Sequence, residues 1–459
     1  MASYDYDLVV IGSGAGGSIA AQQVSKAGKR VAIVESGNLG GSDVTFGSVP
    51  LQALLNSAKL YENAKNGTRF GIRGATIGYN YPSVKAWKDV VVKRTGIYHT
   101  RNAFMELGIN VIEGRAYFID PHTISIGAAR FTADEFLIAT GSELTLPEIP
   151  GLTKTGFITT KEAVNLTRPP KRLAIVGNNK NACELAQLFA IFGSKVYIID
   201  SAPHLLEHEE PEVSNHVETQ FRESYSMSLL LGSTVSKVEV NGNIKKITVA
   251  YGETTHSIAV DEILIASNKK AATDIGLENA GVEYEDGSIY IDRTMKTSAK
   301  HIYAAGSCVG EYASSHVATY QSQIVAHNVL HPRSVTSIDY RAIPRVVSLS
   351  PEVASVGLTK HELKLQKISC KSVIVPISVV AKANISDFNG GFIKIISQEK
   401  TNTLLSASIV CPGAEEVIHE LTLAIQNYLT AAQVGRTMHA FPTWSEAVRV
   451  ACLQLAQRD

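Results

Sequence analysis

Three glycines near the start of the chain have the spacing of a loop that binds the diphosphate of a dinucleotide. Gly12, Gly14 and Gly17 fit the pattern GxGxxG. In such a loop the first glycine allows a tight turn, the second lets the backbone approach the diphosphate, and the third lets a helix pack on a strand. Glu35 follows at the end of the next apolar segment, where an acidic side chain meets the two ribose hydroxyls. These residues predict a dinucleotide site.

The segments around these residues have the pattern of a strand, a turn, a helix and a second strand. Residues 8–11 and 31–34 are continuous apolar runs, which are typical of strands buried in a parallel sheet. Residues 19–27 predict a helix whose N-terminus faces the diphosphate. We therefore expect a mononucleotide-binding unit at the start of the chain.

A second unit of the same kind begins near residue 172, but its glycine loop is altered. Apolar runs at 173–176 and 196–199 flank a predicted helix at 183–192, and Gly177 and Asp200 match the first glycine and the acid. Asn179 replaces the second glycine. A left-handed asparagine would preserve the turn, whereas its side chain would occupy space that the diphosphate needs. Binding of NAD is left open, and the absence of an arginine after Asp200 favours NAD over NADP.

The bulk composition excludes several classes of function. Lys plus Arg and Asp plus Glu both number 43, so the net charge of zero gives no electrostatic reason to expect nucleic acid or an anionic membrane as partner. No apolar run approaches the length of a helix that spans a bilayer. The five cysteines lack CxxC spacing, and residues 1–182 contain none. We expect no metal site, no disulfide scaffold and a cytoplasmic protein.

Five further motifs, in order along the chain, resemble those of the FAD-dependent pyridine nucleotide–disulfide oxidoreductases, which include dihydrolipoamide dehydrogenase, glutathione reductase and mercuric reductase. They lie at residues 35–41, 139–151, 297–306, 341–359 and 439–446. The resemblance implies an α/β chain with two Rossmann-like three-layer dinucleotide-binding domains and a C-terminal α+β dimerisation domain. It places an FAD-binding domain at 1–150 and 271–336, an NAD(P)-binding-like domain at 151–270 and the dimerisation domain, which implies a homodimer, at 337–459.

The resemblance also assigns residues to the cofactors. The residues that it implies for FAD are Gly12, Gly14, Gly17, Glu35, Gly40, Gly41, Ala139, Thr140, Gly141, Gly306 and Ser307. Ser307 stands where relatives have an aspartate, so we expect weaker contacts to FAD. Gly177 and Asp200 are the residues implied for NAD. Residues 266–273 match a turn that closes the nicotinamide domain in relatives, and only Thr273 of its motif is kept.

Several positions that carry out catalysis in the family hold other residues here. Asp43 and Ser48 occupy the positions of the redox cysteines, which are five residues apart. A carboxylate and a hydroxyl cannot replace a sulfur nucleophile in dithiol exchange. Gln52 replaces a lysine that pairs with the glutamate corresponding to Glu184, so we expect Glu184 to lack its cation. Phe441 replaces the general base, which leaves His439 nearby but facing the opposite side, and Glu446 with a structural role such as helix capping.

These observations leave two functions open. The first is an FAD-dependent reductase without a disulfide relay, in which NAD(P)H or another donor reduces the flavin and a quinone-like acceptor is reduced directly. The second is a non-catalytic flavoprotein, which serves as a dimeric scaffold or regulatory partner. Whether the chain is an enzyme therefore stays open, and the acceptor is not determined by the sequence. An ordinary dihydrolipoamide dehydrogenase is disfavoured because the sulfur chemistry is missing.

Overall fold

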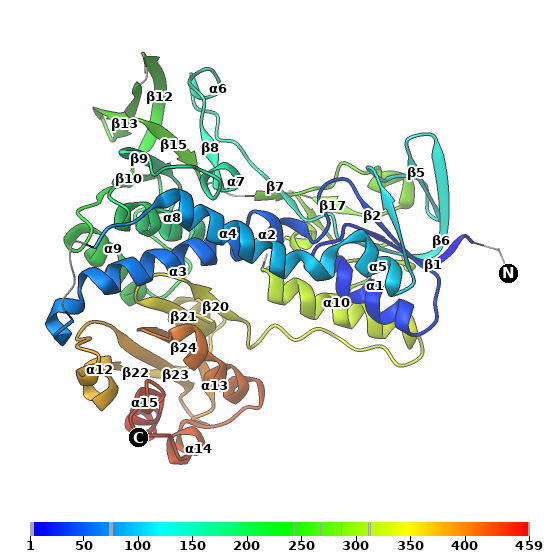
Figure 1. Cartoon of the computed structure of the whole chain (residues 1–459). Coiled ribbons are helices and arrows are strands. Elements are labelled where there is room, and N and C mark those ends of the chain that lie inside the picture. Colours follow the sequence, from blue (N-terminus) through cyan, green and yellow to red (C-terminus); the bar gives the residue numbers. More distant parts are fainter. Residues whose placement is uncertain are drawn as a thin grey trace. The chain divides into compact units, whose positions relative to one another are not determined.

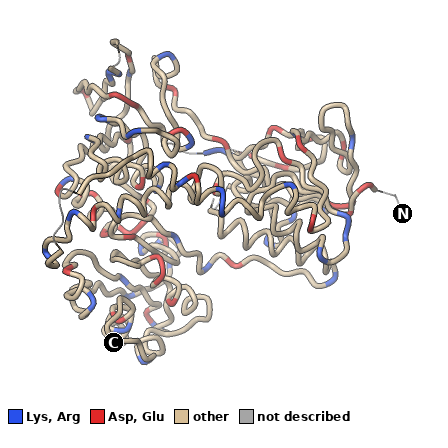
Figure 2. The backbone as a smooth tube through the Cα atoms, in the orientation of Figure 1, with Lys and Arg blue, Asp and Glu red and all other residues tan. Residues whose placement is uncertain are grey.

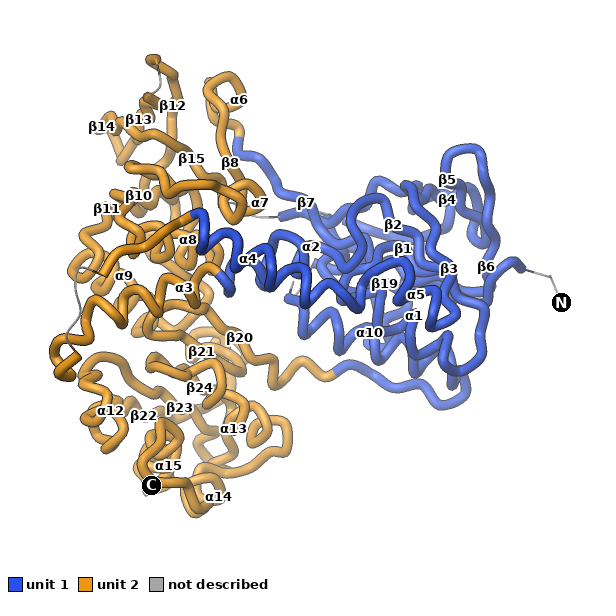
Figure 3. Tube along the Cα trace, viewed as in Figure 1, with its two compact units in different colours: residues 1–53, 82–147, 267–338 blue, residues 54–81, 148–266, 339–459 orange. Residues whose placement is uncertain are grey.

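The structure, a computed structural model, forms two compact units, each built from three stretches of chain (Figure 3). Unit 1 comprises residues 1–53, 82–147 and 267–338, and unit 2 comprises residues 54–81, 148–266 and 339–459. The residues that the structure describes are 4–72, 77–242, 244–266, 269–285, 287–310, 312 and 314–457.

Unit 1 is built around a sheet in the order β3-β2-β1-β6-β5-β4, with β19 also paired to β6. Its strands are β1 (Tyr6–Ile11), β2 (Val31–Glu35), β3 (Ile109–Glu113), β4 (Tyr117–Asp120), β5 (Thr123–Ile126), β6 (Ala129–Ile138) and β19 (Ile302–Ala304). The pairs from β3 to β6, and β6 with β19, are parallel. Leu8, Val9 and Val10 of β1 are all fully buried, because the middle of this sheet is covered on both faces.

Helices α1 (Ala15–Lys26) and α10 (Ser315–Leu330) lie side by side in unit 1 (Figure 1), where the backbone N–H of Ala20 donates to Ser322 Oγ at 2.9 Å. The shorter elements of this unit include α2 (Gly41–Thr45), α5 (Arg101–Glu106), β7 (Ser142–Leu144), β16 (Lys269–Ala271), β17 (Tyr284–Glu285), β18 (Ser288–Ile289) and the single turn η4 (Ser307–Val309). Helices α3 (Ser48–Lys65) and α4 (Tyr81–Gly96) contain residues of both units.

Unit 2 contains a second parallel sheet, in the order β11-β10-β9-β15-β8. Its strands are β8 (Ile158–Thr159), β9 (Arg172–Val176), β10 (Lys195–Asp200), β11 (Ser228–Leu231) and β15 (Glu262–Ile265). The helices of this part are α6 (Leu152–Thr155), α7 (Thr160–Ala163), α8 (Lys180–Ile191) and α9 (Pro211–Glu223). A separate antiparallel sheet is formed by β12 (Thr234–Asn241), β13 (Ile244–Tyr251) and β14 (Thr254–Val260).

The C-terminal part of unit 2 is an antiparallel sheet in the order β20-β21-β24-β23-β22 with helices packed on it (Figure 1). Its elements are β20 (Pro344–Val347), β21 (Glu352–Gly357), α11 (Lys360–Leu365), β22 (Cys370–Pro376), α12 (Ala381–Ile385), β23 (Phe392–Gln398), β24 (Leu404–Cys411), α13 (Ala414–Gln426), α14 (Ala431–Arg436) and α15 (Glu446–Ala456). Helix α13 ends at Gln426; beyond it Tyr428 has a left-handed backbone (φ 55°), and the N–H of Leu429 turns back to the Ala424 carbonyl at 2.9 Å.

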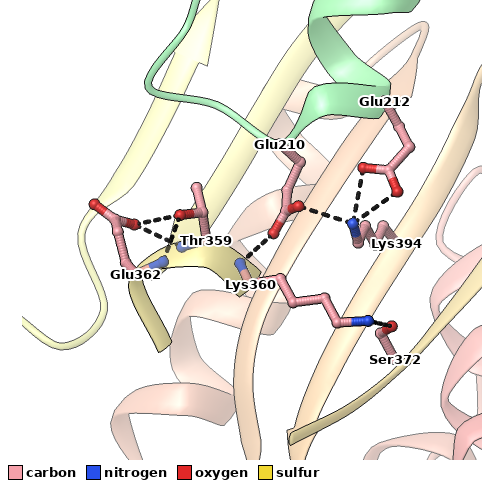
Figure 4. A network of polar contacts seen from close by, with 7 residues as sticks. All are labelled: Glu210, Glu212, Thr359, Lys360, Glu362, Ser372 and Lys394. Carbon is pink, nitrogen blue, oxygen red and sulfur yellow. Dashed lines mark hydrogen bonds and ion pairs between the residues drawn. The ribbon is translucent and has the colours of Figure 1, made fainter. Parts of the chain in front are cut away.

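A buried ion pair holds the start of α9 to the C-terminal sheet within unit 2 (Figure 4). Lys394 Nζ of β23 lies 2.8 Å from Glu210 and 2.7 Å from Glu212, while the other oxygen of Glu210 accepts the N–H of Lys360 at 2.6 Å. Burial lowers the pKa of Lys394, but its hydrogen bonds to the two glutamates outweigh burial, and the net pKa is raised. The acidic end of α9 is therefore fixed to the sheet by charge.

The predicted fold class is confirmed: two Rossmann-like α/β parts and a C-terminal α+β part are present. The predicted domain boundaries stay a prediction. Of the expected turn at 266–273, Ser267 and Asn268 lie outside the described residues, and Lys269–Ala271 is not a turn but β16, paired with β7. Basic and acidic side chains, 43 of each in the sequence, are both spread along the chain (Figure 2).

Candidate functional site

In unit 1 the predicted glycine loop is brought into contact with two other chain segments. A Cβ atom on Gly12 (φ 108°) would lie 2.2 Å from the carbonyl oxygen of Ala139, and one on Gly41 (φ 73°) would lie 2.6 Å from Gly14 Cα. Such separations exclude any side chain at these positions. Since the two backbones approach the loop this closely, residues 12–17, 40–41 and 139–141 lie together at the N-terminus of α1.

Glu35 is held beside these residues by Ser13. One carboxylate oxygen accepts the Ser13 N–H at 2.9 Å and the Ser13 hydroxyl at 2.7 Å, and the other accepts the Gly37 N–H at 2.8 Å. The Ser13 hydroxyl also accepts the N–H of Gly40 at 3.0 Å, and Ser13 is fully buried. One serine thus ties the first glycine loop, Glu35 and the glycine pair together. Ser13 was not predicted as a site residue, because its only signal in the sequence is its place inside GxGxxG.

The residues present fit an FAD. Among the described residues, no side chain caps the N-terminus of α1; the Gly17 N–H donates to the Gly14 carbonyl at 3.0 Å, and the N–H groups of Ala15 and Gly16 remain available to a diphosphate. The Thr140 hydroxyl is buried without a hydrogen-bond partner in the part of the chain that the structure describes, as expected if a bound ligand supplies that partner. A Cβ atom on Gly16 would lie 2.9 Å from the Ala305 carbonyl, which brings Gly306 and Ser307 to the same loop. The role of each residue stays a prediction.

The two positions predicted for the redox cysteines face each other. Asp43 lies in α2 and Ser48 begins α3, and the Ser48 hydroxyl donates to Asp43 Oδ1 at 3.1 Å. The second oxygen of Asp43 accepts a hydrogen bond from Ser315, the first residue of α10. A carboxylate at the N-termini of two long helices is favoured by their dipoles. Ser315 was not predicted, because 272 residues separate it from Asp43.

In unit 2 the glycine loop at residues 177–182 has a backbone like that of the first loop. Its helix, α8, differs from α1 because a side chain caps its N-terminus. A Cβ atom on Gly177 (φ 137°) would lie 2.4 Å from the carbonyl oxygen of Ala266. The suggestion that Asn179 preserves the turn in a left-handed conformation is wrong: its φ is −79° and ψ is 178°. Asp200 lies at the end of β10 and accepts the N–H of Ala202 at 2.8 Å, and burial raises its pKa.

Glu184 was expected to lack a cation, and this expectation is wrong. Its side chain is buried, and Oε1 lies 3.8 Å from Lys180 Nζ, one turn earlier in α8. The same oxygen accepts the N–H of Ser348 at 2.8 Å. Burial raises the pKa of Glu184 although Lys180 and Ser348 oppose the rise. The predicted relation of Glu184 to Gln52 stays a prediction, since Gln52 belongs to unit 1.

In the C-terminal segment, an apolar side chain stands at the position predicted to correspond to the family's general base. Phe441 is 75% exposed. His439 is enclosed instead, with Nδ1 at 2.9 Å from the Thr437 carbonyl and Nε2 at 2.8 Å from Glu420 Oε1. Both partners are hydrogen-bond acceptors, so both ring nitrogens are engaged by this pair. Glu446 begins α15 but makes no side-chain cap, and among the described residues its Oε2 has no hydrogen-bond partner.

Two of the cysteines, Cys183 and Cys308, are fully buried. Burial raises the pKa of both thiols, that of Cys308 to about 11. Within the described residues, no group of three or more His, Cys, Asp or Glu side chains is arranged to hold a metal ion. No helix in the described ranges combines the length and apolarity that a membrane span requires.

Comparison with known proteins places this geometry in a family. Residues 6–322 match the model of the pyridine nucleotide-disulphide oxidoreductases, and residues 343–452 match their dimerisation domain. The chain is 32% identical over 451 residues to a mercuric reductase of Staphylococcus aureus, which covers 98% of this chain and 82% of the relative. It is 33% identical over 459 residues to a dihydrolipoyl dehydrogenase of Chlamydia trachomatis, with 97% of both chains covered.

Solved structures agree. The HOCl-induced flavoprotein disulfide reductase RclA from Escherichia coli superimposes with a TM-score of 0.85 at 26% identity, covering 99% of this chain and all of the other. A Cu(II) complex of a variant of the same protein gives a TM-score of 0.89 at 25% identity over all of both chains. The two glycine loops and the order of the strands in the sheets are consistent with these matches. The chain therefore belongs to the pyridine nucleotide-disulphide oxidoreductase family of flavoproteins.

Proposed function

We propose that this chain is an FAD-dependent oxidoreductase that works without a disulfide relay and exchanges electrons directly with a diffusible, quinone-like acceptor. The observation that carries the proposal is the hydrogen bond between Asp43 and Ser48, which stand where the family's redox cysteines are expected. Neither group can be oxidised and reduced as a thiol pair can. The absence of cysteine from residues 1–182 supports the same conclusion.

FAD, when bound, supplies both two-electron and one-electron chemistry. The roles that we assign to the chain are binding and positioning. The N-terminus of α1 binds the diphosphate, and Glu35, held by Ser13, binds the ribose hydroxyls. Asp43 holds Ser48 and Ser315 together by accepting a hydrogen bond from each hydroxyl.

The match of residues 343–452 to the dimerisation domain supports a homodimer. By resemblance to the family, this domain faces the flavin of the second copy. Here it would present Phe441 in place of a base, and the exposure of that ring fits an apolar acceptor.

A test requires the purified protein with its flavin. We expect flavin absorption bands, reduction of the flavin by dithionite in the absence of oxygen, and rapid reoxidation by p-benzoquinone. Oxidised lipoamide and glutathione disulfide, the matched disulfide acceptors, should leave the reduced flavin unchanged. Reoxidation by a disulfide at a rate similar to that with quinone would sink the proposal.

One observation favours a second candidate, a non-catalytic dimeric flavoprotein. The second nucleotide loop carries Asn178 and Asn179, and the side chain of Asn179 occupies the end of α8. A chain selected for binding rather than turnover can accumulate such changes together with Asp43, Ser48 and Phe441. Flavin that is reoxidised by neither quinone nor disulfide would support this alternative.

A further inference from the structure

The two glycine loops of this chain can be compared directly, because their backbones are equivalent. Gly14 is the residue before α1 and Asn179 is the residue before α8, and both are extended, with φ of −70° and −79°. The first glycines also match. Gly12 N–H donates to Val34 O at 2.8 Å, and Gly177 N–H donates to Ile199 O at 3.0 Å. One difference between the loops is therefore the side chain that precedes the helix.

That side chain closes the second loop from within. Asn179 Oδ1 accepts the N–H of Ala182 at 3.1 Å, and Nδ2 donates to the carbonyl of Ala266, beyond the end of β15, at 2.7 Å. The Ala182 N–H belongs to the first turn of α8, so the two bonds hold the Asn179 side chain across the start of that helix. At the equivalent place in unit 1, Gly14 brings no side chain.

Neighbouring residues hold the loop in this closed form. Asn178 Nδ2 donates to the His204 carbonyl at 3.0 Å, and the Asn178 carbonyl accepts the N–H of Leu206 at 3.0 Å. The loop that follows Asp200 is thereby tied to the glycine loop. Lys180, the first residue of α8, has its amino group 3.8 Å from the buried carboxylate of Glu184. The Lys180 ammonium is thus directed to a carboxylate of its own helix.

We infer that Asn179 closes the second dinucleotide loop and that unit 2 does not take the diphosphate of NAD or NADP in the manner of the family. The residues present do not fit this group, because the side chain of Asn179 stands where the backbone must approach the diphosphate. The inference concerns unit 2 alone and holds whether or not the flavin reacts directly with an acceptor. It makes Asn179 the residue that determines which reductant the protein can use.

The test is a calorimetric titration of the flavin-loaded protein with NAD⁺ and with NADP⁺. The oxidised nucleotides cannot reduce the flavin, so the readout is binding alone. We expect no saturation of the natural protein at millimolar nucleotide. The Asn179→Gly variant keeps a residue that is acceptable before a helix, removes the side chain that fills the loop, and should bind NAD⁺ at least about tenfold more tightly.

Two further variants serve as controls. Thr430→Gly removes a side-chain cap from α14 in the same unit, where Thr430 accepts the N–H of Gln433 at 3.3 Å, and should leave nucleotide binding unchanged. Gly14→Asn is the reciprocal change. A Cβ atom there would meet Gly41 Cα at an ordinary 3.7 Å, so the chain should fold, as circular dichroism would show, but retain at least about tenfold less FAD.

Binding of NAD⁺ or NADP⁺ to the natural protein with a dissociation constant below about 0.1 mM, the range of working cofactors, would overturn the inference. It would equally be overturned by an Asn179→Gly variant that folds and binds no better than the natural protein. If that variant does not fold, Asn179→Ala takes its place, and the titration of the natural protein stands by itself.

Discussion

Replacing Ser13 with alanine tests how the flavin site is held together. Its hydroxyl donates to Glu35 Oε2 at 2.7 Å and accepts the Gly40 N–H at 3.0 Å, and the residue is fully buried. The substitution removes one hydrogen bond to a carboxylate and leaves the buried N–H of Gly40 without its acceptor. Glu35 keeps the Ser13 N–H, so it is loosened but not released.

The size of the effect follows from these two bonds. A hydrogen bond to a charged group contributes about 1.5–3 kcal/mol, and an orphaned buried donor costs about 1–3 kcal/mol. Because the two share one atom, their sum overestimates the effect, and we expect Ser13→Ala to lower the free energy of unfolding of unit 1 by about 2–4 kcal/mol. Because the variant's loosened Glu35 and Gly40 must be reordered when FAD binds, the dissociation constant of FAD should rise about ten- to a hundredfold.

The assay is titration of the apoprotein with FAD, followed by the quenching of flavin fluorescence, together with thermal unfolding. Ser25→Ala is the matched control, since Ser25 donates to the Leu107 carbonyl at 2.7 Å in the same unit, away from the glycine loop. Ser25→Ala should lower the free energy of unfolding by about 1 kcal/mol and leave the dissociation constant of FAD unchanged. A Ser13→Ala protein with the FAD affinity of the Ser25→Ala control would refute the role assigned to Ser13.

Three further predictions rest on separate contacts. Lys394→Met leaves Glu210 buried without its cation and should lower the free energy of unfolding by about 3–5 kcal/mol in urea titrations, and a loss below about 1 kcal/mol would contradict the buried pair. Burial, reinforced by Asp134, raises the pKa of Glu135 from 4.5 to about 7, so its contribution to stability is complete below pH 4.5 and is lost as the pH rises through 7. Glu135→Gln should therefore stabilise the protein by about 2–3 kcal/mol at pH 8 but not at pH 4.5, and equal shifts of the melting temperature at both pH values would argue against this. Because Ser48 Oγ lies 3.1 Å from Asp43 Oδ1, the double variant Asp43→Cys, Ser48→Cys should oxidise to a disulfide. The denatured variant would then have five free thiols, as many as the natural chain. A count of seven free thiols would show that the fold does not bring the two positions together.

Local patterns predicted the elements well, and their boundaries less well. The strand predicted at 8–11 is β1 at Tyr6–Ile11, and the helix predicted at 183–192 is α8 at Lys180–Ile191. The second helix begins earlier because Asn179 caps it, which no apolar pattern records. The Lys269–Lys270 segment was predicted as a turn but is part of the strand β16. Its two lysines are exposed, and its partner strand, β7, lies far away in the sequence, so no local apolar pattern marks the strand.

The sequence by itself determined the class of the protein, because the spacing of Gly12, Gly14, Gly17 and Glu35 lies within one strand–helix–strand unit whose geometry is local. The tertiary structure decided the partners of the chemical groups. Asp43 meets Ser315, Glu184 meets Ser348, and Asn179 meets Ala266 only when the folded chain closes over long separations. A residue's type states which bonds it can make, but its burial and its neighbours decide which of them it makes. For that reason the asparagine in the second loop could be noticed in the sequence, but that it closes the loop could be read only from the fold.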